Sequence, residues 1–159
     1  MHAVELERQH YWFNRLAVMG QDYKLPLVIH SRSARQETID AIKSYGVKYA
    51  VIHCFSEDIV FAQELMEWSP DIYFSFSGIV TYKSALEIQD AASKIPLNRI
   101  LVETDAPYLS PAPDRSSTNE PAKTAITLEK IISLRSEPRE EVIKTIYENS
   151  MRFYQLQSS

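Results

Sequence analysis

The sequence is poor in residues that several common protein classes require. Its 159 residues include three glycines and one cysteine. Three glycines are too few for a glycine-rich phosphate-binding loop, and a single cysteine excludes a disulfide scaffold. The net charge is −4, from 17 Lys and Arg against 21 Asp and Glu. A strongly basic nucleic-acid coat protein is therefore excluded. A nucleic-acid enzyme with local or metal-mediated contacts is not.

Long apolar runs are also missing. The longest apolar stretches, such as 49–55, fall far short of the roughly 20 residues that a membrane-spanning helix needs. The N-terminus lacks the basic start and apolar core of a signal peptide. A single unpaired thiol fits a reducing compartment. The sequence therefore predicts a soluble, cytoplasmic protein without a membrane partner.

The length sets a further limit on the fold. A complete eight-stranded α/β barrel needs roughly 200 to 250 residues, more than this chain has. Hydrophobic residues make up 45% of the chain and charged residues 24%, as in an ordinary globular domain. We expect one domain over residues 1–154 and a frayed tail at 155–159.

Short apolar runs alternate with amphipathic helical segments along the chain. Equivalent positions in successive runs lie 23, 24 and 25 residues apart, at Ile29, Ile52, Phe76 and Leu101. Such regular spacing indicates repeated β/α units and hence a parallel sheet. The expected strands cover 25–30, 48–53, 72–77 and 99–104. The expected helices cover 4–23, 33–45, 58–68, 82–94, 122–134 and 138–149, with a long loop at 105–120.

Each apolar run ends in side chains that can take part in chemistry. These residues are His30, His53, Ser77 and Glu103-Thr104-Asp105. Ligand sites in parallel α/β folds form outside the carboxyl ends of the strands, so two imidazoles and a carboxylate should meet at one rim. That donor set suits a divalent Zn, Mn or Mg ion, which would activate water there. A hydrogen-bonded structural role is the alternative for either histidine taken alone.

Three nearby features have two interpretations each. Arg32, two residues after His30, could hold a phosphate by a bidentate contact or form a salt bridge at the start of a helix. Cys54 is expected to be a small buried side chain rather than a nucleophile. The pair Ser77-Gly78 fits either a close approach of the backbone to a ligand or a plain turn.

Several segments, in the same order, resemble the TatD family of metal-dependent deoxyribonucleases. The most distinctive is LVETDAPYLSP at 101–111, and LPLVIHSR at 25–32 resembles the family's strand with a following HxR motif. The other matching segments are IHCFS at 52–56, FSFSGIVTY at 74–82 and NEP at 119–121. The resemblance runs over about 4–153, nearly the whole chain.

The resemblance implies a TIM-type barrel with a dinuclear metal site that hydrolyses phosphodiester bonds, typically of DNA. The histidines matching His30 and His53 bind one metal in the family, and the aspartate matching Asp105 binds the other. Asp105 could also take part in proton transfer as a catalytic residue. Arg32 occupies the arginine position of the HxR motif, where it would contact a substrate phosphate.

Other family features have no counterpart in this chain. The HxH pair of the family's first strand and a later metal-bridging glutamate are missing. The chain therefore resembles only the C-terminal half of the barrel, strands five to eight. In the loop before the NEP segment, Arg115-Ser116-Ser117 stands where the family usually has Arg-Gly.

The expected fold is thus a partial TIM-type barrel of four parallel strands, and the expected function is metal-dependent hydrolysis of DNA. A truncated, catalytically incomplete half-barrel that needs a partner chain is the alternative. Hydrolysis of another bond, such as an amide or a D-aminoacyl ester, is a third reading. Because a half-barrel leaves two open sheet edges, we expect self-association or pairing with a missing N-terminal half.

Overall fold

The structure is a computed structural model that describes residues 3–156, with side chains described from residue 6. The helices are α1 (Ala3–Tyr23), α2 (Arg35–Ser44), α3 (Ile59–Trp68), α4 (Leu86–Lys94), α5 (Thr124–Leu134) and α6 (Arg139–Phe153). The strands are β1 (Leu27–His30), β2 (Ala50–His53), β3 (Ile72–Phe76) and β4 (Ile100–Val102). Short 3₁₀ turns lie at Gly78–Thr81, Leu97–Arg99 and Pro121–Lys123. Of the tail expected at 155–159, residues 157–159 lie outside the described part of the chain.

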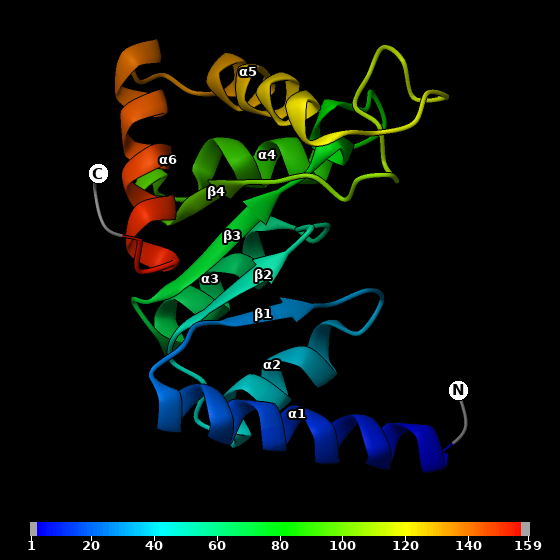
Figure 1. Cartoon of the computed structure of the whole chain (residues 1–159), viewed down its shortest axis with the longest axis vertical. Helices are drawn as coiled ribbons and strands as arrows, with labels where there is room; N and C mark the ends of the chain where they lie inside the picture. The colour runs from blue at the N-terminus through cyan, green and yellow to red at the C-terminus, as the bar shows by residue number, and fades with distance from the viewer. Residues whose placement is uncertain (1–2, 157–159) are drawn as a thin grey trace.

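The four strands form one parallel sheet in the order β1-β2-β3-β4 (Figure 1). His30 pairs with His53 across β1 and β2, so the two strands end level with each other. The predicted four-stranded parallel sheet of β/α units is confirmed. Within the described residues, β1 and β4 each have a strand on one side only. The outer edge of β4 is covered by α6, whose Asn149 donates to the Ile100 carbonyl, whereas among the same residues no strand or such hydrogen bond covers the outer edge of β1.

The elements differ from the expected ones mainly at their ends. The strands at 25–30 and 48–53 each start two residues later than expected, because the parallel ladder begins at Leu27 and Ala50. The helix expected from residue 82 starts only at Leu86, since a 3₁₀ turn and a bend precede it. The last helix continues past Asn149 to Phe153. Asn149 does not end the helix because it is buried and donates from Nδ2 to the carbonyls of Leu97 and Ile100.

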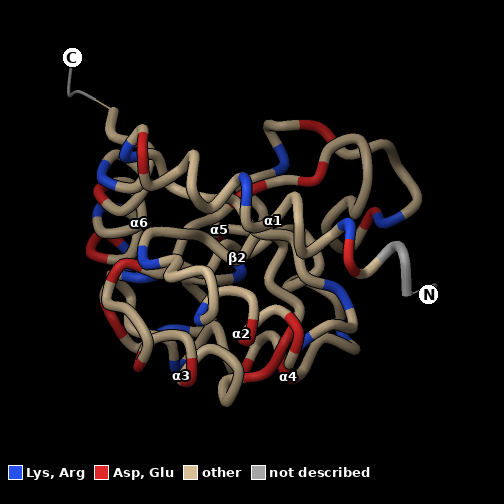
Figure 2. Tube along the Cα trace, turned by 90° about the horizontal axis from the view of Figure 1, so that it is seen from below, with Lys and Arg blue, Asp and Glu red and all other residues tan. Residues whose placement is uncertain are grey.

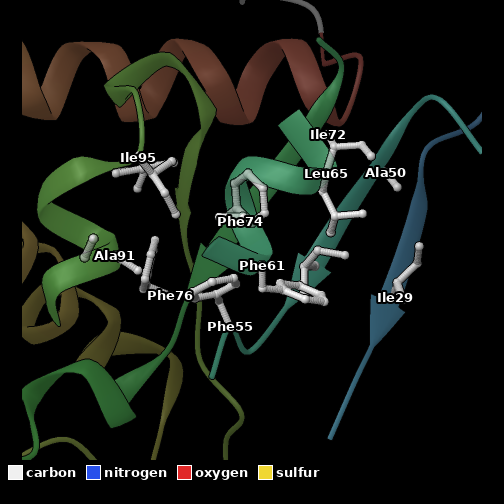
Figure 3. Close-up of a cluster of buried hydrophobic side chains, with 14 of the residues drawn as sticks. Ile29, Ala50, Phe55, Phe61, Leu65, Ile72, Phe74, Phe76, Ala91 and Ile95 are labelled. Carbon is white, nitrogen blue, oxygen red and sulfur yellow. The ribbon is translucent and has the colours of Figure 1, made fainter. Parts of the chain in front are cut away.

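One face of the sheet packs against helices α2, α3 and α4 (Figure 1). Aromatic rings fill the centre of this layer (Figure 3). The Phe55 ring lies 5.4 Å from the rings of both Phe74 and Phe76 and 6.1 Å from that of Phe61. All four side chains are fully buried. Each such ring contributes about 1.5–3 kcal/mol on burial, so this layer fixes the strands as a rigid base for whatever lies at their ends.

The opposite face of the sheet is covered by the end of α6 at its amino end, where the strands begin. Val51, Tyr73 and Leu101 point to this face and are buried against Phe153, the last residue of α6. The Tyr49 hydroxyl donates to the carbonyl of Phe153 at 2.6 Å and so fixes the end of α6 in this place. At β1 the same face is open, because the Val28 side chain, level with Val51 in the register, is 59% exposed.

Charges of both signs are interspersed over the surface rather than gathered into one basic face (Figure 2). This distribution agrees with the net charge of −4. Between residues 3 and 156, none of the helices is both long and apolar enough to span a membrane.

Asp58 begins helix α3 and links it to α2. Its Oδ1 accepts a hydrogen bond from the amide of Phe61 at 2.9 Å, and its Oδ2 accepts one from Arg35 at 2.8 Å. The Phe61 amide first, and then Arg35, lower the pKa of the Asp58 carboxyl below its usual 3.8. Because Phe61 belongs to the aromatic layer, this cap also stabilises the core.

We predict that Asp58→Ala lowers the free energy of unfolding by about 1 kcal/mol at neutral pH, the usual value of a lost N-cap. Asp58→Asn should retain the cap but not the charge. A lowered folded pKa means that the charge contribution is fully present above pH 3.8 and is lost as the pH falls through the folded value. Urea unfolding at neutral and acidic pH should therefore show wild type and Asp58→Asn converging in acid. Equal stability of all three proteins at neutral pH would contradict the prediction.

Candidate functional site

The candidate site lies at the carboxyl edge of the sheet, where the sequence places it. His30 and His53 are the last residues of β1 and β2. β4 ends at Val102, but the Glu103 amide still donates to the carbonyl of Phe76, at 3.0 Å, and extends the strand pairing by one residue. The chain then carries Asp105 back toward His53.

His53 lies between two carboxylates. Its Nδ1 is 2.8 Å from Oε2 of Glu103, and its Nε2 is 2.9 Å from Oδ1 of Asp105. One ligand atom from each of the three residues lies within 4.8 Å of the other two. All three side chains are partly buried. The imidazole is therefore held from both sides in one orientation.

These two contacts define what can lie between His53 and Asp105. A doubly protonated ring donates to both carboxylates. A neutral ring carries one proton, and if that proton lies on Nδ1 toward Glu103, then Nε2 directs its lone pair at Asp105. Two unprotonated acceptor atoms 2.9 Å apart repel each other unless a proton or a metal ion lies between them. A histidine whose other nitrogen is held by a carboxylate is also the usual form of a metal-ligating histidine. The residues present thus fit a divalent cation.

Glu103 is the functional residue that sequence reasoning missed. The sequence places it at the end of a strand but assigns it no role. Besides the His53 contact, its Oε1 accepts a hydrogen bond from the amide of Cys54. Glu103 therefore fixes both the ring of His53 and the turn that follows it. The available signal was the two-residue alternation of side chains along a strand, which places Glu103 on the same face of the sheet as Leu101.

His30 lies beside the cluster without belonging to it. Its ring centroid is 6.0 Å from that of His53, with the two planes at 48°. The His30 side chain is exposed, and its ring makes no hydrogen bond to the described residues. The structural alternative of a satisfied, hydrogen-bonded histidine therefore does not describe His30, which offers its ring nitrogens to solvent.

A pocket of about 440 Å³ opens next to the cluster. His30, Ser31 and Arg32 line it from the end of β1. Asp105, Tyr108 and Leu109 line it from the loop after β4, with Ile79 beside them. Sequence reasoning thus named four residues that the structure brings to one place. Three of them, His30, Arg32 and Asp105, line this pocket, and His53 contacts Asp105.

Arg32 does not form the salt bridge considered for it. Its side chain is exposed, and within the described residues it has no carboxylate partner. The ion pair at the start of α2 is made instead by Arg35, which contacts Asp58. The Arg32 guanidinium at the pocket wall keeps its donors available for a ligand.

Cys54 is buried, as predicted. Its Sγ lies 3.1 Å from the hydroxyl of Ser77. Burial, more than any neighbouring charge, raises the pKa of the Cys54 thiol to about 12. A thiol with such a pKa is protonated at neutral pH and does not act as a nucleophile.

Residues with a left-handed backbone conformation cluster around the pocket. Among the described residues, five that are not glycine have a positive φ, and three of these are Ser33 (52°), Cys54 (48°) and Leu109 (55°). Cys54 and Leu109 line the pocket, and Ser33 follows Arg32. Such conformations cost energy and concentrate at functional sites, where the surrounding structure holds them in place.

The loop after β4 packs tightly on Gly78. A Cβ atom built on Gly78 would lie 2.3 Å from the carbonyl oxygen of Leu109. The pair Ser77-Gly78 therefore does bring backbone close to a neighbour, but that neighbour is the loop rather than a ligand. Thr81 adds a second anchor, because its hydroxyl accepts a hydrogen bond from the amide of Ala112 at 2.7 Å.

A parallel sheet with imidazole and carboxylate groups at its carboxyl edge is the arrangement of the metal-dependent hydrolase superfamily of TIM-type barrels. Comparison with protein families identifies the family within this superfamily. The family described as TatD related DNase matches residues 2–155, and the chain belongs to this family.

Relatives in three bacteria agree with this assignment. The Escherichia coli K12 protein named uncharacterized metal-dependent hydrolase YcfH is 36% identical over 96% of this chain and 57% of its own length. The Bacillus subtilis protein of the same description, YabD, is 32% identical over 91% of this chain and 56% of its own length. Mycobacterium tuberculosis TatD, likewise named an uncharacterized metal-dependent hydrolase, is 37% identical over 82% of this chain and 49% of its own length. The chain spans about half the length of these relatives.

Solved structures show the same fold. The crystal structure of YJJV, a TatD homologue from Escherichia coli, superposes with a TM-score of 0.88 at 25% identity and covers 95% of this chain and 58% of that one. A TatD family hydrolase from Entamoeba histolytica has a TM-score of 0.78 at 19% identity. This match covers 90% of this chain and 55% of the other. The second likeness concerns the fold alone.

We predict that Gly78→Ala displaces the loop at 105–120. The added methyl group would meet the Leu109 carbonyl at 2.3 Å, so the backbone must shift. Overpacking of this kind costs about 1–3 kcal/mol. Hydrogen exchange of peptides from the loop should become faster. Gly20→Ala is the matched control, because its nearest neighbour is the mobile end of the Leu27 side chain at 3.0 Å. Unchanged exchange in Gly78→Ala would show that the contact does not fix the loop.

Proposed function

We propose that the chain is the metal-binding part of a hydrolase that cleaves phosphodiester bonds of DNA. The observation that carries this proposal is the cluster of His53, Glu103 and Asp105 beside a pocket that also contains Arg32. The names of the relatives agree with the broader class, since they are metal-dependent hydrolases.

His53 and Asp105, with His30 from the neighbouring strand, would hold divalent metal, either Mg, Mn or Zn. Such an ion supplies an activated water and polarises a phosphoryl oxygen. Glu103 would keep the ring of His53 turned toward the ion. Loss of such an outer partner typically weakens metal affinity about 10- to 100-fold.

The remaining groups of the pocket have roles suited to a phosphodiester. The Asp105 carboxylate can accept a proton from the attacking water. The Arg32 guanidinium presents paired donors that match two phosphate oxygens. A free guanidinium beside the cluster favours a phosphodiester over an amide or a D-aminoacyl ester.

DNA affinity would come from local cations, since the chain is acidic overall. Arg32 is one such cation. Arg115 is a second, and its guanidinium carbon lies 3.8 Å from the centre of the Tyr82 ring. The exposed Lys83 next to Tyr82 is a third.

We predict metal-dependent cleavage of DNA that depends on His53 and Asp105. The protein should cleave single- or double-stranded DNA with Mg or Mn, and EDTA should abolish cleavage. His53→Ala and Asp105→Asn should each reduce the rate at least about 100-fold, since each removes a ligand or proton acceptor. Titration calorimetry should show the matching loss of metal binding.

Asp90→Asn is the matched control, because Asp90 is an exposed carboxylate on α4 whose ion pair with Lys94 lies outside the pocket. It should behave as wild type. Amide and D-aminoacyl ester substrates, assayed in parallel, distinguish the other bond types. DNA cleavage that survives both EDTA and the His53 substitution would contradict the proposal.

We also propose that the open sheet edge at β1 is closed by association with a second chain of this kind. β1 lacks an outer neighbour in the described structure, and apolar side chains lie exposed beside it. These are Trp12 and Leu16 on α1, Leu25 before β1, and Val28 on β1. An exposed edge strand with apolar surroundings tends to pair with another chain.

The predicted consequence is a particle larger than one 18.3-kDa chain in light scattering after size exclusion. Val28→Lys should shift the particle toward the monomer, because it puts a charge on the open face. Val60→Lys is the control, since Val60 is similarly exposed (55% against 59%) but lies on α3, behind the sheet. A wild-type protein that is a stable monomer would refute self-association.

A further inference from the structure

The pocket beside the cluster has two chemically different sides. From β1 come His30, Ser31 and Arg32, which are polar or charged. From the loops after β3 and β4 come Asp105 and an apolar side made of Ile79, Tyr108 and Leu109. The proposed metal and phosphate chemistry uses His30, Arg32 and Asp105. The apolar side has no role in it.

Tyr108 is the prominent side chain of the apolar side. Its side chain is 73% exposed although it borders a pocket. Its hydroxyl group makes no hydrogen bond to any described residue. An exposed ring of this kind adds nothing to the core, so folding alone does not explain it.

The backbone of Tyr108 is nevertheless fixed, because both its amide and its carbonyl are hydrogen-bonded. Its amide donates to the carbonyl of Asp105 at 2.8 Å. Its carbonyl accepts a hydrogen bond from Nδ2 of the buried Asn119 at 2.7 Å. The same Nδ2 donates to the hydroxyl of Thr104 at 2.9 Å. Asn119 thus links the backbone of Tyr108 to the residues just after β4.

The rest of the loop is held as firmly. The Leu109 carbonyl packs on Gly78, and the Tyr82 hydroxyl donates to the carbonyl of Ser110 at 3.0 Å. Lys123 donates to the hydroxyl groups of Ser110 and Ser117 and to the carbonyl of Thr118. The ring of Tyr108 is thus presented from a rigid support, which lowers the entropic cost of binding a flat ligand.

We propose that Tyr108 is a stacking platform for the nucleobase next to the phosphate held at Arg32 and the metal ligands. This inference rests on the proposed function and adds a base subsite to it. A nucleotide has an anionic part and a flat aromatic part, and the two sides of the pocket match them. At about 440 Å³ the pocket has the size of a small-molecule site and is larger than a phosphate group requires.

Stacking on Tyr108 also determines the form of DNA that fits. A base can lie flat on the ring only when it has left its own base stack, so the subsite takes single-stranded DNA or a frayed end. Every base has a flat face, so binding is tolerant of sequence.

The test measures equilibrium binding of a short fluorescent single-stranded oligonucleotide in EDTA, where no cleavage interferes. Tyr108→Ala should bind roughly 5- to 150-fold more weakly, the range found for one base stacked on an aromatic side chain. Tyr108→Phe should bind like wild type, because the ring rather than the hydroxyl does the stacking. Tyr147→Ala is the control, because Tyr147 is also largely exposed (61% against 73%) but lies on α6, outside the pocket.

A second arm separates stacking from a general change of shape. Each base of the oligonucleotide is replaced in turn by an abasic spacer. For wild type, one position should show the largest loss of affinity. In Tyr108→Ala that position should show no extra loss, since the ring and the base act as a pair. Melting temperatures should be equal for all variants.

The outcomes are distinguishable. Equal affinities of wild type and Tyr108→Ala, or the same abasic profile for both, would overturn the stacking inference and leave the hydrolase proposal intact. Ring-dependent binding without metal-dependent cleavage would support the subsite and refute the hydrolase. A wild-type protein that binds no DNA in EDTA would overturn the stacking inference, and the cleavage assay with metal then tests the hydrolase proposal by itself.

Discussion

The register of the four parallel strands is the constraint on which the site depends. His30 and His53 face one another in the ladder, and Glu103 continues the pairing of β4 with β3 by one residue. The register is in turn fixed by the aromatic layer behind the sheet, because a slip of one residue would turn Phe74 and Phe76 to the open face. Packing of apolar rings thus determines where the imidazole and the carboxylates meet.

The site combines rigidly held side chains with side chains that have unused hydrogen-bonding groups. Glu103 and Asp105 hold the ring of His53, and the Cys54 amide holds Glu103. By contrast, His30 and Arg32 line the pocket without a hydrogen bond or an ion pair to any described residue. Fixed groups next to free ones are what a binding site requires, since the fixed groups need no rearrangement and the free groups supply the attraction.

Much of the fold was predictable because its signals are local. The spacing of the apolar runs identified four strands, and their final residues identified His30 and His53. The missed features depend on contacts between residues far apart in the sequence. Glu103 acquires its role from His53, 50 residues away, and Asn149 stays helical because of the carbonyls of Leu97 and Ile100. The contacts that hold the loop after β4 could not be predicted either, because the residues that hold it, Gly78 and Lys123, come from different elements.

The closure of the amino end of the sheet by Phe153 has a consequence for the order of folding. Each strand pairs with the next one along the chain, so the sheet can grow as its β/α units emerge in turn. The Tyr49–Phe153 contact instead spans 104 residues, and it can form only when α6 has been made. Contacts of such large separation form late because the intervening chain must first be ordered. Until then Val51, Tyr73 and Leu101 stay in water, and the nascent sheet is a surface that another chain, or a chaperone, can reach.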